Sequence, residues 1–116
     1  MSLQIMPQQV LQESSAKVTA AFKDTDSQDA VTPISATWSL MALDGTIINS
    51  RSNVAISSPT SSEEIWLTGD DLQLLDNNNE YELRKFLLQA TYNNGASVVP
   101  LTAEGQFSVY NVTGVS

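Results

Sequence analysis

The residues best suited to chemistry in this sequence are its carboxylates, and three of them fall in one short segment. Asp24, Asp26 and Asp29 lie in the run DTDSQD, which separates two stretches of alternating apolar residues. Ca²⁺ prefers clustered carboxylate oxygens, so these three are the candidate metal ligands. The spacing, central glycine and terminal glutamate of an EF-hand are absent, and the composition favours a solvated turn. We therefore expect neither a bound metal nor a cofactor.

Other catalytic arrangements are also missing from the sequence. Glu63 and Glu64, like Asp70 and Asp71, are adjacent in the chain, and adjacent residues of a strand point to opposite faces. Neither pair alone can supply the facing carboxylates of a glycosidase. The chain has no histidine to activate a serine, and no cysteine for thiolate chemistry or disulfides. No GxSxG segment or phosphate-binding glycine loop is present. The sequence therefore predicts a protein that is not an enzyme.

Two aromatic residues are the candidates for an interaction site. Trp66 stands between Ile65 and Leu67 in EEIWLT, so it faces solvent if those two residues face the core. An exposed tryptophan can bind a sugar or a protein. The alternative, which we favour from sequence, is that Trp66 packs against a neighbouring strand or the N-terminal segment. Tyr110, in QFSVYNV, has the same two interpretations.

The charge of the chain narrows the classes of partner. Thirteen acidic and five basic residues give a net charge of −8, which repels nucleic acid and anionic membranes. No apolar run approaches the roughly 18 residues that span a bilayer. We therefore expect protein partners, with no binding to nucleic acid or membrane, and the sequence leaves the oligomeric state open.

The elements that must position these residues follow a period of two. In ISATWSL, Ile34, Ala36, Trp38 and Leu40 share one face, and KVTAAFK alternates in the same way. Turn signals separate such segments: Asp44-Gly45, SSPTSS at 57–62 and NNG at 93–95. Short strands joined by these turns predict an all-β fold, an antiparallel two-sheet sandwich of about seven strands. We expect a single sandwich domain over residues 16–116, preceded by a loosely ordered N-terminal arm over residues 1–15.

The predicted core draws one apolar face from several strands. Its expected members, which should meet between the two sheets, are Phe22, Trp38, Leu40, Ile65, Leu67, Leu75, Leu88, Ala90 and Phe107.

A run of three asparagines separates Leu75 from Tyr81 at the start of the longest apolar segment. The chain from Trp38 to Tyr81 resembles immunoglobulin and fibronectin type III domains, with a core tryptophan, a leucine and then a tyrosine. The resemblance implies a corner between the two sheets, where the Tyr81 hydroxyl bonds to the backbone just upstream. Tyr81 and Phe86 have opposite parity, so either a bulge near Arg84-Lys85 intervenes or one of them faces solvent.

A second resemblance concerns the class of protein. The segments ATWSLMALDGTIINSRSNVAI and LTGDDLQLL are similar to small open reading frames of tailed phages and prophages. This resemblance implies a non-catalytic head- or tail-associated structural or assembly protein, whose partners are other virion or assembly proteins. Its location would be the host cytoplasm during assembly and then the virion. The alternative is a carbohydrate- or surface-binding adhesion module, which would need exposed aromatic residues clustered on one face.

Overall fold

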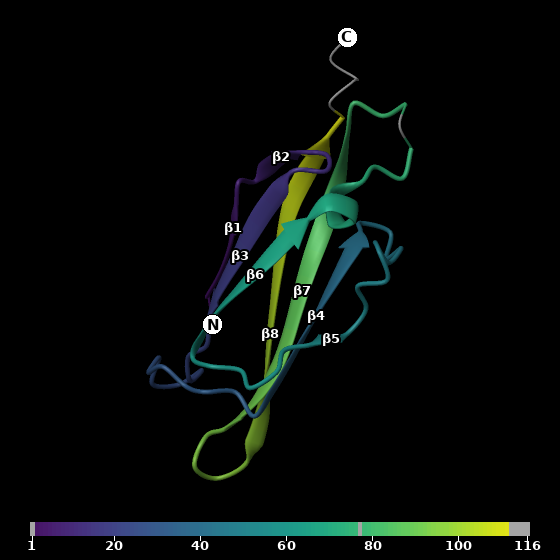
Figure 1. Cartoon of the computed structure of the whole chain (residues 1–116). Coiled ribbons are helices and arrows are strands. Elements are labelled where there is room, and N and C mark those ends of the chain that lie inside the picture. The colour runs from purple at the N-terminus through teal and green to yellow at the C-terminus, as the bar shows by residue number, and fades with distance from the viewer. Residues whose placement is uncertain (1, 77, 112–116) are drawn as a thin grey trace.

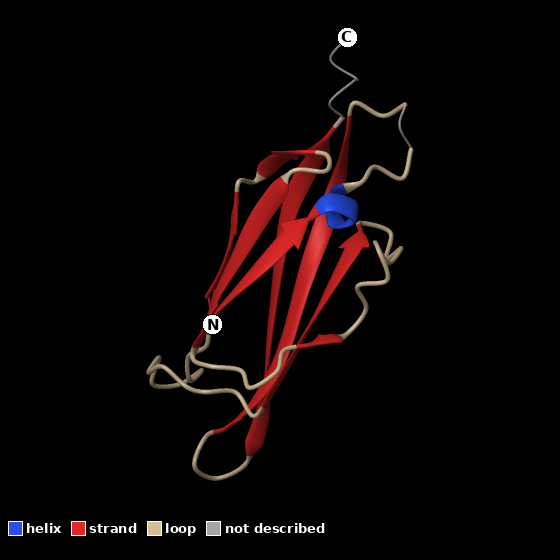
Figure 2. Cartoon of the chain, viewed as in Figure 1, coloured by secondary structure: helices blue, strands red, loops and turns tan. Residues whose placement is uncertain are grey.

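The computed structural model describes residues 2–76 and 78–111, and its strands form two sheets (Figure 1). The three-stranded sheet has the order β1-β3-β6, with β1 at Ser2–Met6, β3 at Ser15–Ala21 and β6 at Ser62–Thr68. The five-stranded sheet has the order β2-β8-β7-β4-β5, with β2 at Gln9–Leu11, β8 at Val98–Tyr110, β7 at Tyr81–Asn93, β4 at Ser35–Ala42 and β5 at Val54–Ala55. A single 3₁₀ turn, η1 at Gly69–Leu72, is the helical element of the described residues (Figure 2). The prediction of an all-β fold in two sheets is confirmed.

The strand pairing differs from the expected sandwich in one respect. β2 runs parallel to β8, whereas the other paired strands are antiparallel. The expectation of a purely antiparallel fold is therefore corrected, and three plus five strands exceed the about seven that were expected. The parallel pair arises because β1 and β2, which follow each other in the chain, join different sheets.

The N-terminal segment is part of both sheets. Residues 1–15 were expected to form a loosely ordered arm, but β1 pairs with β3 and β2 pairs with β8. Ile5 and Val10 are each only 3% exposed, so both strands contribute to the core. β1 lies against β8 at Gly105, where an added Cβ atom would stand 2.8 Å from Cδ1 of Ile5. Strands of five and three residues are too short to show a clear period in the sequence.

The core lies between the sheets and is formed by alternate residues of each strand. Eight of its nine predicted members are buried, among them Trp38, which stacks on Phe86 at 5.3 Å between ring centroids. Leu75 is the exception, since it is 60% exposed. Leu72 and Leu74, from η1 and the residues after it, occupy the core in its place.

β7 contains no bulge. Its register with β8 runs without interruption from Tyr81 opposite Tyr110 to Asn93 opposite Val98. Phe86 is therefore buried, and Tyr81 faces outward with 49% of its surface exposed. The expected tyrosine corner is therefore wrong. Of the two alternatives that the parity allowed, the bulge near Arg84-Lys85 is absent and the solvent-facing residue is Tyr81. The sequence suggested the corner and the bulge because the inward positions at the start of β7 are polar, namely Glu82 and Arg84.

The predicted turns are present. Gly45 has a φ of +95° and donates its N–H to the carbonyl of Ala42, while Gly95, between β7 and β8, has a φ of +97°. The segment GDDLQLL contains the helical turn η1. It begins after Thr68, whose backbone N–H donates to the Asp71 carboxylate at 3.2 Å.

Candidate functional site

Trp66 lies on the outer face of the three-stranded sheet. It occupies β6 opposite Lys17 of β3, and 58% of its surface is exposed. The ammonium nitrogen of Lys17 is 5.8 Å from the centroid of the indole ring and 3.7 Å from Oε1 of Glu64. A cation held over an exposed tryptophan contributes about 0.5–1 kcal/mol, so Lys17 orients the ring without covering it. The predicted outward orientation of Trp66 is confirmed. Its contact with the neighbouring strand β3 is through Lys17, and more than half of its surface remains exposed.

Tyr110 lies on the outer face of the other sheet, at the end of β8. Its ring stacks on Tyr81 of β7, with 5.2 Å between centroids and an interplanar angle of 25°. On its other side it is paired in register with Leu11 of β2. Leu11, Tyr110 and Tyr81 thus form a row across three strands, called here the tyrosine row, in which Leu11 and Tyr81 are 53% and 49% exposed.

The two predicted interaction residues therefore belong to different surfaces. Trp66 is on the three-stranded sheet and Tyr110 on the five-stranded sheet, with the core between them. Sequence reasoning missed Tyr81 and Leu11 as members of the second surface. The sequence did contain a signal for Tyr81. Tyr81 and Leu83 alternate out of phase with Phe86 and Leu88, so they point to the outer face of β7, the face on which Tyr110 lies.

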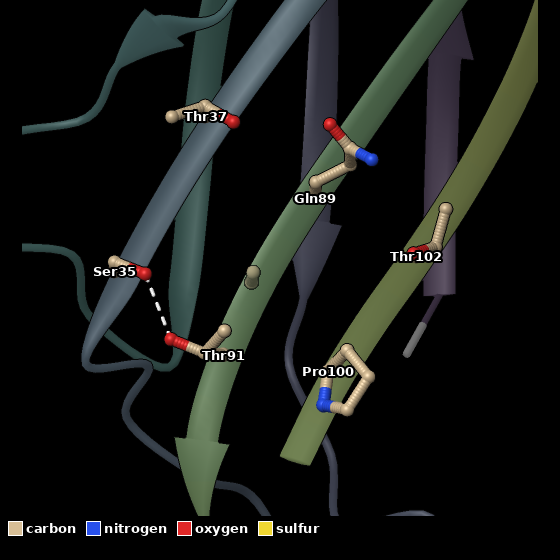
Figure 3. Close-up of a pocket in the computed structure, with 7 residues that line it drawn as sticks. Ser35, Thr37, Gln89, Thr91, Pro100 and Thr102 are labelled. Atoms are coloured by element: carbon tan, nitrogen blue, oxygen red, sulfur yellow. Dashed lines mark hydrogen bonds between the residues drawn. The ribbon is translucent and has the colours of Figure 1, made fainter. Parts of the chain in front are cut away.

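Two shallow hollows lie on the outer face of the five-stranded sheet. The first, of about 280 Å³, crosses β4, β7 and β8 and has an uncharged lining of Ser35, Thr37, Gln89, Ala90, Thr91, Pro100 and Thr102 (Figure 3). Within it, the hydroxyl oxygens of Ser35 and Thr91 are 2.7 Å apart. The second hollow, of about 310 Å³, adjoins the tyrosine row, with a lining of Gln8, Gln9, Leu83, Gln106, Phe107 and Ser108. The lining of both hollows can hydrogen-bond a ligand but offers no acid or base for catalysis.

The aspartate segment forms a turn. Oδ1 of Asp24 accepts the backbone N–H groups of Asp26 at 2.8 Å and Ser27 at 3.0 Å, and the Asp24 N–H donates to the carbonyl of Asp29. The bonds from Ser27 and Asp26 lower the pKa of Asp24 below its usual value. No group of three or more acidic side chains in residues 2–76 and 78–111 is arranged to hold a metal ion. Asp24, the weak metal candidate, organises the loop with its neighbours.

A partly buried carboxylate organises the loop that holds the asparagine run. Glu82, on the inner face of β7, accepts the backbone N–H groups of Leu75 at 2.8 Å and Asp76 at 3.0 Å. It also accepts Nδ2 of Asn79 at 2.7 Å and forms an ion pair with Arg84. Burial alone would raise the pKa of Glu82, but Arg84 and the other donors lower it to about 2. The loop therefore wraps around an anion that stays charged.

Arg84 extends this network into the core. Its side chain is only 1% exposed, and it donates to the backbone carbonyls of Leu83 and Gln73, each at 3.0 Å. Asn111, the residue after β8, donates its side-chain amide to the carbonyl of Asn79 at 3.2 Å. Glu82 compensates the charge of Arg84, and the carbonyl groups of Leu83 and Gln73 accept its terminal N–H groups, which permits a guanidinium between the sheets, although its Nε has no hydrogen-bond partner among the described residues.

A second buried ion pair fixes η1. Asp71 is 1% exposed, and its Oδ1 accepts Nε of Arg51 at 2.7 Å and Nδ2 of Asn49 at 2.8 Å. Burial would raise the pKa of Asp71, but the bonds from Arg51 and Asn49 lower it below its usual value. The guanidinium carbon of Arg51 lies 5.5 Å from the centroid of the Trp38 ring. The carboxylates of Glu82 and Asp71 are therefore both hydrogen-bonded by the chain itself, and sequence spacing gave no signal for either ion pair.

Comparison with known proteins adds no family assignment. The sequence matches no protein-family profile, and no similar sequence is found among curated proteins. Within the part of the chain that the structure describes, no helix is long and apolar enough to cross a membrane.

Proposed function

We propose that the protein is a non-catalytic interaction module of the phage or prophage type, a head- or tail-associated structural or assembly protein. The observation that supports this most is the exposure of aromatic side chains on the outer faces of both sheets, Trp66 on one and the tyrosine row on the other. Exposed aromatic residues are typical of protein contacts. The partners would be other virion or assembly proteins, met in the host cytoplasm during assembly and then retained in the virion.

We infer further that the sandwich is of the immunoglobulin type. Its support is the buried Trp38 on β4, which pairs with β7 in the sheet that also contains β8, as strand C with its core tryptophan pairs with F beside G in immunoglobulin domains. The added edge strand β5 next to β4 corresponds to the extension found in variable-type domains. Such domains present their outer faces and end loops to partners, which agrees with an interaction role.

The second candidate function is a carbohydrate- or surface-binding adhesion module. The glutamine-lined hollow beside the tyrosine row favours it, because amides and aromatic rings are the groups that bind sugar hydroxyls and sugar faces. Trp66, the most exposed aromatic side chain, lies on the other sheet and cannot join the two tyrosines in one sugar site, which weighs against it. We therefore rank it second.

Particle association tests the first proposal. Tagged protein expressed during phage induction in its source bacterium should appear in purified particles or in assembly intermediates, detected by mass spectrometry. Trp66→Ala should fold normally and be depleted from them, while Thr19→Ala, at a neighbouring outward position of the same sheet, should not. Absence of the wild-type protein from both fractions would reject the phage assignment.

A glycan array distinguishes the second proposal. An adhesion module should bind at least one glycan, with a change in tryptophan fluorescence that disappears in Trp66→Ala or a loss of binding in Tyr81→Ala. Glycan binding that is lost in these variants, together with absence of the protein from particles, would favour the adhesion module over the phage assembly protein.

A further inference from the structure

The outer face of the five-stranded sheet is nearly free of charge, although the protein is strongly acidic. The outward positions of β2, β8, β7 and β4 include one cation, Lys85, and one anion, Glu104. The chain has five basic and thirteen acidic residues, so four basic and twelve acidic residues lie elsewhere. The face therefore has a net charge of zero, and the whole charge of −8 belongs to the rest of the molecule.

Lys85 and Glu104 are close to each other and unpaired. Lys85 stands opposite Gln106 and Leu87 stands opposite Glu104, so the two charges lie on neighbouring strands, one outward position apart. Ion pairs in the described part of the chain join Lys17 to Glu64, Arg51 to Asp71 and Arg84 to Glu82. The two charges of this face take part in none of them.

The same face has an apolar end. The tyrosine row crosses β2, β8 and β7, and Leu83, at the next outward position of β7, is 41% exposed. From there the face continues past Lys85, Glu104 and Leu87 to the hydroxyl and amide side chains of the hollow at Ser35 and Thr91 (Figure 3). Enrichment in tyrosine and depletion of charge distinguish the centre of a protein interface from ordinary surface.

We propose that this face is the interface of a homodimer, in which two copies pack face to face with their strands aligned. A two-fold axis along the boundary between β7 and β8 places each β7 over β8 of the other copy. Tyr81 then meets the partner's Tyr110, so the two tyrosine rows cover each other. The two lysines and two glutamates meet in one neutral cluster, which supplies the partners that they lack in a single chain.

Charge and area favour a second copy over an unrelated partner. Two molecules of charge −8 repel each other through any acidic surface, and this face is a neutral surface through which they can meet. The outer face of the three-stranded sheet also has one cation and one anion, Lys17 and Glu64, but these two pair with each other within the chain, whereas Lys85 and Glu104 do not. β7 and β8 have 13 residues each, which corresponds to a length of about 44 Å, and three neighbouring strands span about 14 Å. The projected area is on the order of 600 Å², close to the roughly 800 Å² per partner of a standard interface.

Charge reversal tests the dimer with the purified full chain. Sedimentation equilibrium should give a mass that rises with concentration from the 12.6 kDa of one chain to about twice that value. Lys85→Glu and Glu104→Lys should each weaken the dimer roughly tenfold or more, because each places like charges together. The double variant K85E/E104K should restore it, since it returns both signs to the cluster.

Matched controls separate this interface from a general effect of net charge. Lys23→Glu and Asp26→Lys make the same changes in charge in the exposed loop after β3 and should leave the dimer unchanged. Circular dichroism would verify the fold of every variant. A monomer at all concentrations, a dimer insensitive to both single reversals, a double variant as weak as the single ones, or controls as damaging as the reversals would each overturn the proposal. None of these outcomes depends on the phage assignment, because no other protein is present in the measurement.

Discussion

The two tryptophans show how position on a strand decides what a residue does. Trp38 is 7% exposed and stacks on Phe86, while Trp66 is 58% exposed. Trp38→Ala should lower the free energy of unfolding by about 3–5 kcal/mol, because it removes a buried ring and leaves a cavity. Trp66→Ala should lower it by less than about 1 kcal/mol. Urea denaturation of both variants checks this, and similar losses would mean that the assignment of inward and outward faces is wrong.

The hydroxyl groups of Tyr92 and Tyr81 give a second comparison between a buried and an exposed side chain. Tyr92 is 2% exposed and its hydroxyl oxygen accepts the backbone N–H of Thr25 at 3.1 Å, whereas Tyr81 is half exposed. Tyr92→Phe should therefore cost about 1 kcal/mol, the net value of one hydrogen bond, and Tyr81→Phe should cost close to zero. Thermal denaturation of the two variants measures the difference. A larger loss of stability for Tyr81→Phe than for Tyr92→Phe would contradict this structure and support a tyrosine corner at Tyr81.

Among the elements, β4 and β7 show what alternation can and cannot predict. The inward set of β4, including Trp38 and Leu40, follows directly from a period of two in apolar residues. β7 keeps the same period, but its first inward positions are Glu82 and Arg84, so the apolar pattern begins only at Phe86. An ion pair inside the core has no hydrophobic signature, and its hydrogen-bond partners lie in a loop whose path the sequence does not show. The same reason hid the pairing of Asp71 with Arg51.

The Glu82 network makes the loop between η1 and β7 sensitive to acid. Glu82→Gln should cost about 3 kcal/mol at neutral pH, because it leaves the buried Arg84 without its counter-charge. The pKa of Glu82 is lowered from 4.5 to about 2 on folding, so its contribution is complete above pH 4.5 and is lost as the pH falls toward 2.

The measurement is the difference in unfolding free energy between wild type and Glu82→Gln across that pH range. The difference should shrink steadily from pH 4.5 to 2, since the wild-type side chain becomes protonated and neutral as well. Glu80→Gln, at an exposed position of the same loop, should show only a small difference throughout. A difference for Glu82→Gln that did not change with pH would show that the carboxylate is not held charged in the folded protein.

At the scale of the whole molecule, the two N-terminal strands close the sandwich. The class of fold could be predicted because alternation and turn residues recur from Val18 to Phe107. The closure of the sandwich by β1 and β2 could not be predicted, because these strands are five and three residues long and each contributes few apolar side chains. For the interaction surface, the sequence indicated Trp66 and Tyr110 singly. Only the pairing of β2, β8 and β7 shows that Tyr110 belongs to a row with Leu11 and Tyr81.

Closure by β1 gives the last prediction. Ile5 is 3% exposed, faces Val18 of β3 in register and lies over Gly105 of β8 in the opposite sheet. Ile5→Ala should lower the free energy of unfolding by about 2–5 kcal/mol, the cost of emptying a core site. Gln4→Ala, one residue away on the outward face of the same strand, should change it by less than about 0.5 kcal/mol. Hydrogen exchange of β3 and β8 backbone amides should rise in Ile5→Ala, and equal stability of the two variants would show that β1 is not part of the folded core.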